Sequence, residues 1–255
     1  MDEKNSIRFV DEEDASETLP EDFEPYVKEW FNDKFPGLSE PQKYSFDLIH
    51  NDENSLICAP TGSGKTLSAF MSALNELFAM GDQGELDDEV YVLYVSPLRA
   101  LGNDIERNLE DPLSGIREKA EEMGYEVPEV RSAVRTGDTT DSEKAKMRDK
   151  PPHIMITTPE SLGILLSSPK FREKMRNTKY TIIDEIHSLS ENKRGVHMSM
   201  SMERLEDLTH TSPTRIGLSA TQAPIDEIAK YLAGYDVEEE TWTEETEYDE
   251  EIDAA

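Results

Sequence analysis

The segment Ala59-Pro60-Thr61-Gly62-Ser63-Gly64-Lys65-Thr66 has the residue types and spacing of a loop that binds the phosphates of a nucleotide. It follows the apolar run Leu56-Ile57-Cys58 and opens a stretch with helical spacing, which is the strand–loop–helix context that such a loop needs. Its glycines let backbone N–H groups approach phosphate oxygens, and the helix N-terminus adds a positive dipole end. Lys65 is expected to be solvated without ligand and to reach the β- and γ-phosphates, while Thr66 holds Mg²⁺. The alternative is a chance Gly/Ser turn, and Ala59 does depart from the strict pattern, which has glycine there.

A second motif supports the first. The segment Thr181-Ile182-Ile183-Asp184-Glu185-Ile186-His187 is a β-branched run that ends in two carboxylates, as expected at the carboxyl edge of a buried parallel strand. Asp184 is placed to hold Mg²⁺ through water, and Glu185 to orient and deprotonate the water that attacks the γ-phosphate. Many strands end in acids, but together with the upstream loop this motif predicts that the chain binds and hydrolyses ATP.

The elements that position these motifs alternate between strand and helix. The predicted strands are Ser55–Cys58, Val90–Val95, Glu129–Val134, Ile154–Thr157, Tyr180–Ile183 and Arg215–Leu218. The predicted helices are Thr66–Met80, Arg99–Met123, Ser142–Arg148, Pro159–Leu166, Gly195–Leu208 and Ile225–Leu232. This alternation predicts an α/β fold with a mostly parallel sheet and helices on both faces. Both motifs follow strand ends, where such sheets bind ligands.

Composition divides the chain into three parts. Residues 1–22 are acidic with few large apolar residues and predict a flexible arm, so structure is expected to begin near Phe23. Residues 23–234 form the predicted ATP-binding domain, in which Ser39 caps a helix that has Pro41 in its first turn. Residues 235–255 are mostly acids and predict a solvated tail or a linker.

The charge and the cysteine content limit the function classes. There are 56 acids and 26 bases, for a net charge of −30, whereas nucleic-acid binders usually present a basic surface. Such acidity also suits a salt-rich cytoplasm, so we expect a halophilic protein. Cys58 is the single cysteine, which excludes an internal disulfide. The sequence has no apolar run of membrane-spanning length and no signal-peptide pattern at Met1, which predicts a cytoplasmic protein without a membrane partner.

Seven segments occur in the order of the motifs of superfamily 2 helicases, and the chain resembles that group. They are Pro41-Gln42, Thr61-Gly62-Ser63-Gly64-Lys65-Thr66, Ser96-Pro97-Leu98-Arg99-Ala100-Leu101, Arg135-Thr136-Gly137-Asp138-Thr139, Thr157-Thr158-Pro159-Glu160-Ser161-Leu162, Asp184-Glu185-Ile186-His187 and Ser219-Ala220-Thr221. Within the group the chain is similar to the Lhr (large helicase-related) type. That similarity is carried by the DEIH segment, by Asn192-Lys193-Arg194-Gly195-Val196-His197, and by Arg215-Ile216-Gly217-Leu218-Ser219-Ala220-Thr221. The resemblance implies a RecA-like P-loop NTPase domain.

The resemblance also implies roles for the matched residues. Gln42 would read adenine, since its amide offers a donor and an acceptor, and Phe31 or Phe35 would stack on the base or belong to the core. Residues His187, Ser219 and Thr221 would couple the nucleotide site to the nucleic acid. The phosphates of one DNA or RNA strand would be contacted, without reading sequence, by Pro97, Arg99, Gly137, Asp138, Thr158, Pro159 and Arg194.

One departure from the resemblance concerns completeness. A superfamily 2 helicase holds ATP between two RecA-like domains, and no second motif set follows Thr221. The chain therefore looks like one motor domain that hydrolyses ATP poorly alone and needs a second RecA-like domain as partner. Two alternatives stay open: an RNA helicase of the Ski2 or DEAD-box type, and a non-catalytic motor half that binds and regulates a partner.

Overall fold

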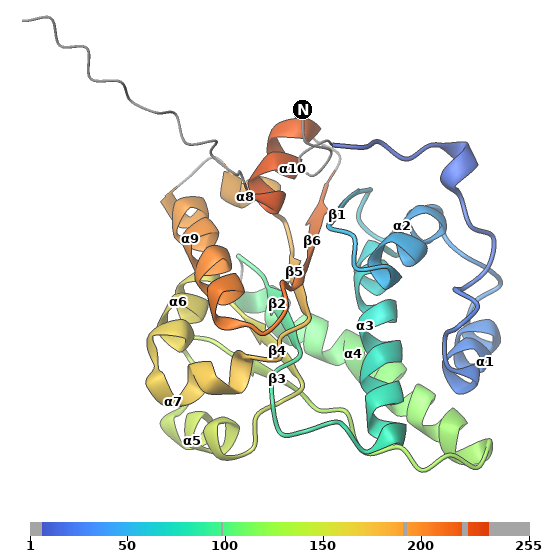
Figure 1. Cartoon of the computed structure of the whole chain (residues 1–255), viewed down its shortest axis with the longest axis horizontal. Coiled ribbons are helices and arrows are strands. Elements are labelled where there is room, and N and C mark those ends of the chain that lie inside the picture. Colours follow the sequence, from blue (N-terminus) through green and yellow to red (C-terminus); the bar gives the residue numbers. More distant parts are fainter. Residues whose placement is uncertain (1–6, 98, 191–192, 221–223, 235–255) are drawn as a thin grey trace, which may run out of the picture.

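The computed structural model describes residues 7–97, 99–190, 193–220 and 224–234, with the backbone alone for 99–103. Six parallel strands form one sheet in the order β1-β6-β5-β2-β4-β3 (Figure 1). The strands are β1 (Ser55–Cys58), β2 (Val92–Val95), β3 (Ser132–Arg135), β4 (Ile154–Thr157), β5 (Tyr180–Ile183) and β6 (Thr214–Ser219). The predicted α/β fold with a parallel sheet is confirmed.

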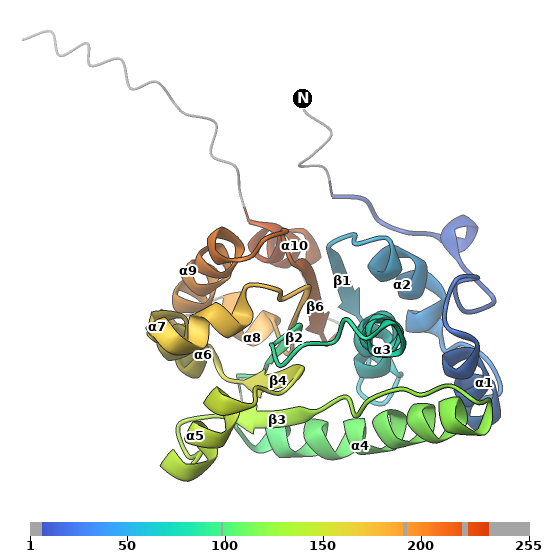
Figure 2. The ribbon, with the colours of Figure 1, turned by 60° about the horizontal axis from the view of Figure 1, so that its bottom comes forward.

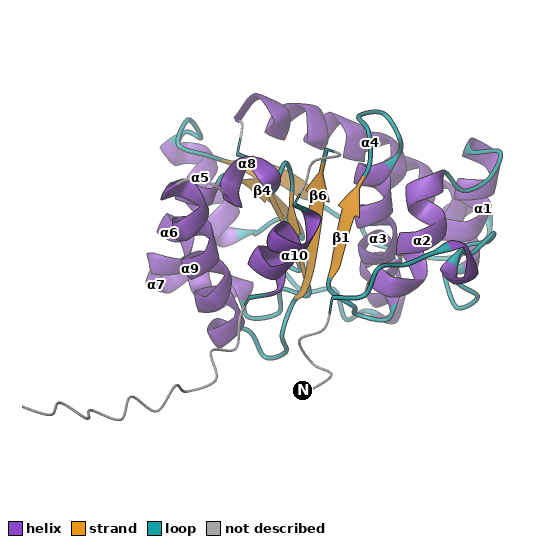
Figure 3. Ribbon diagram, turned by 90° about the horizontal axis from the view of Figure 1, so that it is seen from above, coloured by secondary structure: helices purple, strands orange, loops and turns teal. Residues whose placement is uncertain are grey.

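Helices cover both faces of this sheet (Figures 2 and 3). On one face lie α1 (Pro25–Lys34), α2 (Glu40–His50), α3 (Lys65–Gln83) and α4 (Arg99–Glu122). On the other lie α6 (Pro159–Ser167), α7 (Pro169–Arg172), α9 (Lys193–Leu208) and α10 (Ile225–Ala233). The remaining elements are η2 (Glu12–Asp14), α5 (Asp141–Asp149), η3 (Glu173–Met175) and α8 (His187–Ser190). In the described residues, no helix has both the length and the apolar character needed to cross a membrane.

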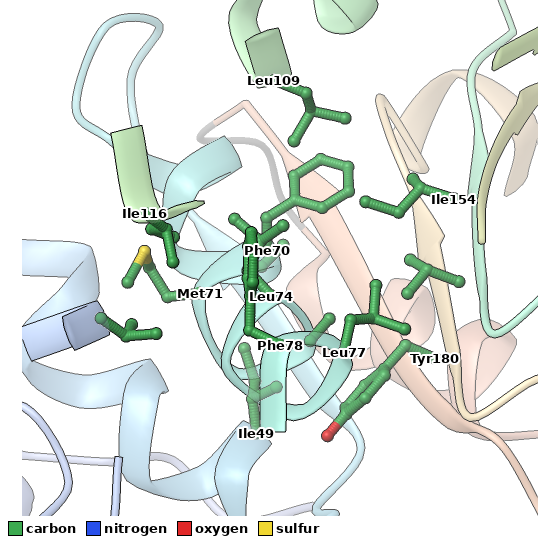
Figure 4. Packing of buried hydrophobic residues seen from close by; sticks show 14 of the residues in the cluster. Ile49, Phe70, Met71, Leu74, Leu77, Phe78, Leu109, Ile116, Ile154 and Tyr180 are labelled. Atoms are coloured by element: carbon green, nitrogen blue, oxygen red, sulfur yellow. The ribbon is translucent and has the colours of Figure 1, made fainter. Parts of the chain in front are cut away.

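The core is split by the sheet into two clusters, because successive strand side chains point to opposite faces. In β2, Val92 and Tyr94 belong to the cluster under α1–α4, and Leu93 and Val95 belong to the one under α6–α10. Helix α3 is the centre of the first cluster, where Phe70, Leu74 and Phe78 lie among side chains from α2, α4 and the sheet (Figure 4). The helix that leaves the phosphate-binding loop is therefore fixed firmly against the sheet.

Three strands differ from the prediction in their bounds, and the strand expected at Arg215–Leu218 is one residue longer at each end, Thr214–Ser219. The strand expected at Val90–Val95 begins at Val92, because the N–H groups of Val90 and Tyr91 donate to Lys174 and His153 outside the ladder. The strand expected at Glu129–Val134 is Ser132–Arg135. Just before β3, the Arg131 carbonyl accepts hydrogen bonds from the N–H groups of both His153 and Ile154. The chain before Ser132 therefore already contacts the start of β4, but it is not a regular strand.

Structure begins earlier than Phe23, contrary to our expectation of a loose arm. Within residues 7–22, Asp11 caps η2, and the Ser16 N–H donates to the Lys43 carbonyl of α2 at 2.8 Å. Leu19 is buried in the first core cluster. Because Leu19 is surrounded by acidic and polar residues in the sequence, the sequence pattern alone could not show that this segment packs against the domain.

Candidate nucleotide site and nucleic-acid face

The loop between β1 and α3 has the backbone shape of a phosphate cradle. Gly62 and Gly64 have φ of 80° and 91°, the left-handed region that favours glycine. A Cβ on Gly64 would lie 2.8 Å from Ser39 Oγ, so the loop packs closely on the start of α2. The Ser63 hydroxyl is buried and has no hydrogen-bond partner within the described residues. These features, with a helix start behind them, fit a nucleotide phosphate group.

Lys65 is buried rather than solvated, which corrects the expectation from sequence. Its side chain is folded back over the loop, and the residue is 7% exposed. The ammonium group donates to the carbonyl of Ala59 at 2.9 Å and to that of Ser219 at 3.3 Å. Lys65 therefore joins the end of β1 to the end of β6, and to bind a phosphate it would exchange these carbonyls for phosphate oxygens.

The acid pair lies at the end of β5. Asp184 is 7% exposed, and its N–H donates to the Val95 carbonyl of β2 at 2.9 Å. Glu185 adopts a φ of 47°, an uncommon conformation for a residue other than glycine that typically costs about 1–3 kcal/mol. Its N–H donates to Asp184 Oδ1 at 3.0 Å. This turn points two neighbouring carboxylates to the same edge of the sheet.

His187 connects the acid pair to the end of β6. Its Nε2 lies 3.3 Å from Glu185 Oε2, and its Nδ1 lies 3.0 Å from Ser219 Oγ. His187 and Ser219, two of the three residues expected to couple the sites, therefore contact each other. Thr221, the third residue expected to couple the sites, lies outside the described residues. Lys65, Glu185, His187 and Ser219 form one chain of contacts across β1, β6 and β5.

The Mg²⁺ assignment to Thr66 and Asp184 rests on the donor types. No group of three or more His, Cys, Asp or Glu side chains that could hold a metal is found within the described residues. Mg²⁺ in nucleotide sites keeps several waters and uses one or two protein oxygens together with phosphate oxygens. A threonine hydroxyl at the start of α3 and a carboxylate at the end of β5 fit that pattern.

Gln42 lies beside the phosphate-binding loop, but its amide is partly engaged. Its Oε1 accepts the Ser39 N–H at 2.8 Å and so caps α2, and its Nε2 lies near Gly64. The amide nitrogen is thus the group left for adenine. Of the two candidate stacking residues, Phe31 is a core side chain, and Phe35 is partly buried against it at a centroid distance of 4.8 Å.

The ends of the other three strands carry the residues assigned to nucleic acid. Strand β4 lies between β2 and β3, with Thr157 beside Val95 and Arg135. The turns that follow bring Pro97, Thr158 and the Gly137-Asp138 turn to one half of the sheet edge. The phosphate-binding loop and the acid pair lie at the other half, where β1, β6 and β5 end. Asp184 N–H bonds to the Val95 carbonyl, so the two halves meet between β5 and β2.

Several of these residues already have structural partners. The Thr158 hydroxyl caps α6 by accepting the Ser161 N–H at 3.4 Å, and Pro159 occupies the first turn. In the turn after β3, the Asp138 N–H donates to Thr136 Oγ1 at 3.3 Å. These turns therefore present mainly backbone polar groups, rather than free side chains, to a nucleic-acid strand.

Arg194 connects the turn that contains Pro97 with the turn that contains Thr158 and Pro159, all of which are expected to contact a nucleic-acid strand. It donates to the carbonyl of Pro97 at 2.8 Å and to the Glu160 carboxylate at 2.6 Å. Burial acts to raise the pKa of Glu160, but the hydrogen bond and charge of Arg194, together with hydrogen bonds from the Glu160 backbone and Thr158, lower that pKa. We expected Arg194 to contact phosphate directly, and this stays a prediction, because its guanidinium binds Pro97 and Glu160 while its side chain is 41% exposed. The side chain of Arg99 lies outside the described residues, although α4 begins there.

Sequence reasoning missed Tyr94 of β2. Its hydroxyl is buried without a hydrogen bond of normal geometry in the described part of the chain, and its pKa is raised first by burial and then by the nearby carboxylates of Asp184 and Glu185. No sequence signal singles it out, because an aromatic residue in a buried strand is typical of a core.

The sheet order, the glycine-rich phosphate loop and the acid pair define a RecA-like nucleotide-binding domain of the P-loop NTPase class. Comparison with known families agrees with this class. Residues 39–228 match the DEAD/DEAH box helicase family, and the chain belongs to that family.

Similarity to individual proteins falls on the Lhr type, which confirms the resemblance seen in the sequence. The chain is 56% identical to ATP-dependent helicase Lhr-Core protein 2 of Thermococcus barophilus over 229 residues, covering 90% of this chain and 26% of that protein. It is 56% identical to ATP-dependent helicase Lhr-Core of Methanothermobacter thermautotrophicus, covering 83% and 24%. The structure of Mycobacterium smegmatis helicase Lhr bound to ssDNA and AMP-PNP is 41% identical, with a TM-score of 0.78 over 84% of this chain and 27% of that one. The chain thus spans about a quarter of the length of these relatives.

Proposed function

We propose that this chain is an ATP-binding motor domain of an Lhr-type, ATP-dependent nucleic-acid helicase. It would couple ATP hydrolysis to translocation along a single strand, together with a second RecA-like domain. The observation that carries the proposal is the continuous contact from Lys65 through Ser219 and His187 to Glu185. That chain of contacts joins the phosphate-binding loop to the acid pair, and the acid pair borders the strand-contact half of the sheet edge.

Each residue of the nucleotide site has a proposed role. Thr61, Gly62, Ser63 and Gly64 would surround the phosphates with backbone N–H groups, and Lys65 would bind the β- and γ-phosphate oxygens. Mg²⁺, held by Thr66 and Asp184, would neutralise charge that develops on the phosphates. Glu185 would take the proton of the attacking water, and its contact with His187 would hold its carboxylate in place.

Nucleotide binding is the first test. Lys65→Ala removes a charge-assisted contact to phosphate, so the affinity for a fluorescent ATP analogue should fall by about 10- to 100-fold. The variant also loses the bonds to Ala59 and Ser219, so circular dichroism must show that it is folded at the assay temperature. Lys34→Ala, an exposed lysine paired with Asp111, is the control and should bind like the wild type. Equal affinity in Lys65→Ala and wild type would refute the assignment.

Turnover needs the second domain, whose arginine finger is worth about 10³ to 10⁵ in rate in related NTPases. The wild-type chain should hydrolyse ATP weakly alone and faster when the second RecA-like domain and a single strand are added. Glu185→Gln should keep nucleotide binding and lose that stimulated turnover. DNA and RNA strands tested in parallel decide the substrate. Substantial turnover by Glu185→Gln would remove Glu185 from the role of base.

Strand binding is proposed for Pro97, Arg99, Gly137, Asp138, Thr158 and Pro159, with Arg194 supporting them. Arg99→Ala should weaken single-strand binding equally for all sequences and reduce the salt slope by about one unit. Arg8→Ala is a suitable control, because Arg8 is exposed and pairs with Asp14 in the N-terminal segment, which carries none of the residues assigned to the strand. An unchanged salt slope in Arg99→Ala would remove Arg99 from the strand path.

We also propose that the net charge of −30 is an adaptation to concentrated salt. Raising KCl from dilute buffer to molar levels should then increase the free energy of unfolding in urea. A steady loss of stability over the same range would contradict this adaptation. The cytoplasmic location stays a prediction from sequence.

A further inference from the structure

Tyr94 is held rigidly below the acid pair. It is fully buried in β2, and its ring stacks on that of Phe70 in α3, with centroids 5.4 Å apart and planes inclined by 15°. Phe70 is itself buried, five residues after Lys65. A stacked ring between a central strand and the helix of the phosphate-binding loop has little freedom to turn, so the direction of its hydroxyl is fixed by packing.

The pairing of β2 with β5 places this hydroxyl on the side of Asp184. Tyr94 is opposite Ile182, and the ladder continues with the bond from the Asp184 N–H to the Val95 carbonyl. Asp184 is two residues beyond Ile182, so its side chain lies on the same face of the sheet as Tyr94. Burial is the main cause that raises the pKa of Tyr94, and the Asp184 carboxylate is the next.

The Asp184 carboxylate is close enough to the hydroxyl to act on its pKa through a hydrogen-bond contact as well as through its charge, but no hydrogen bond of normal geometry joins the hydroxyl to a partner among the described residues. An unpaired buried hydroxyl is unfavourable, and native proteins rarely keep one without a reason. Asp184 Oδ1 already accepts the Glu185 N–H at 3.0 Å. A donor to the carboxylate from Tyr94 would fix its plane while leaving lone pairs for the nucleotide site.

We propose that the Tyr94 hydroxyl donates a hydrogen bond to the Asp184 carboxylate when Mg²⁺ and nucleotide bind, and so orients that carboxylate. Tyr94 is then a positioning residue that acts through Asp184. This inference rests on the proposed function, because it needs Asp184 to serve the Mg²⁺–nucleotide site.

The protein contains a matched control. Tyr26 in α1 is also fully buried with an unpartnered hydroxyl, and it also packs among aromatic rings, at 5.0 Å from Tyr125 and 6.4 Å from Phe78. It belongs to the same core cluster but lies in α1, whose one candidate for the nucleotide site, Phe31, is a buried core side chain. If the Tyr94 hydroxyl were merely a tolerated defect of packing, its removal would have the same effects as removal of the Tyr26 hydroxyl.

The experiment measures binding of a fluorescent ATP analogue to the 255-residue chain while Mg²⁺ is titrated. Tyr94→Phe should raise the Mg²⁺ concentration at half-maximal binding by about 10- to 100-fold, the usual effect of removing a group that orients a metal ligand. Tyr26→Phe should leave it unchanged. Without Mg²⁺ and nucleotide, both variants should melt within about 2–4 °C of the wild type or above it, since each loses only an unpaired hydroxyl.

Action through Asp184 is tested in a double variant. Asp184→Asn alone should weaken the Mg²⁺ dependence, and adding Tyr94→Phe to it should change nothing further. The inference is overturned if Tyr94→Phe has the same Mg²⁺ dependence as Tyr26→Phe, or if it weakens binding further in the Asp184→Asn background. Absence of Mg²⁺-dependent binding by the wild type would overturn the proposed function and this inference together, whereas the first two results overturn the inference alone.

Discussion

His153 provides a test of how burial at the amino-terminal edge of the sheet governs stability. It precedes β4, is 1% exposed, and its Nδ1 accepts the Arg131 N–H at 3.1 Å. Its Nε2 is buried without a partner among the described residues. Burial first, and then the Arg131 and Lys150 charges, lower the pKa of His153 from 6.5 to about 4, although Asp88 opposes them.

The sign and size of the effect follow from proton linkage. Between pH 6.5 and about 4, the unfolded chain carries a proton on His153 that the folded chain excludes. The free energy of unfolding therefore falls as the pH falls, by roughly 1.4 kcal/mol per pH unit and about 3 kcal/mol in all. The fall from this group stops below the folded pKa.

His153→Gln isolates this contribution, because the amide oxygen still accepts the Arg131 N–H and does not titrate. Urea unfolding at constant salt gives the free energy of unfolding at pH about 6.5 and about 5 for both proteins. The wild type should lose about 2 kcal/mol more than the variant over this interval. Equal losses would refute the claim that the folded protein keeps His153 neutral.

Two further substitutions, with one control, test packing contacts elsewhere in the domain. Arg215→Ala removes a 5% exposed guanidinium that pairs with Glu203 and Glu206 and donates to the Leu232 and Ala233 carbonyls, so urea unfolding should show a loss of about 3 kcal/mol. Arg8→Ala, which breaks an exposed pair, should cost under about 1 kcal/mol, and similar values for the two variants would contradict the reasoning. Gly195→Ala would place a Cβ 2.0 Å from the Leu189 carbonyl oxygen, so α8 and α9 would have to move apart. The melting temperature should therefore fall by several degrees, roughly 2–4 °C per kcal/mol of lost stability. An unchanged melting temperature would show that α8 and α9 can separate without cost.

The sequence was sufficient to predict those parts of the site in which the functional residues directly follow a recognisable apolar strand. The phosphate-binding loop and the Asp184-Glu185 pair follow apolar strands directly, so their place at the carboxyl edge could be predicted. The burial of Lys65 could not, because it depends on carbonyls of Ala59 and Ser219 that only the pairing of β1 with β6 brings together.

Other features escaped for related reasons. Arg194 has the charge of a phosphate contact, and only the folded chain shows that its guanidinium is shared with Pro97 and Glu160. Leu19 is one apolar residue in an acidic stretch, so no periodicity marks it as part of the core. In each case the deciding contact joins residues far apart in the chain, which local propensity and spacing do not record.

The Arg194 bridge has a mechanical consequence. By binding the carbonyl after β2 and the carboxylate at the start of α6 at once, it ties together two turns that would grip neighbouring phosphates. Because the two turns are joined, neither can move along the nucleic acid without the other, and the distance between their phosphate-binding groups stays constant. Under the proposed function, each step along the nucleic-acid strand would then come from movement of this whole domain relative to a second one. Removal of the Arg194 side chain would weaken strand binding before it slowed ATP hydrolysis.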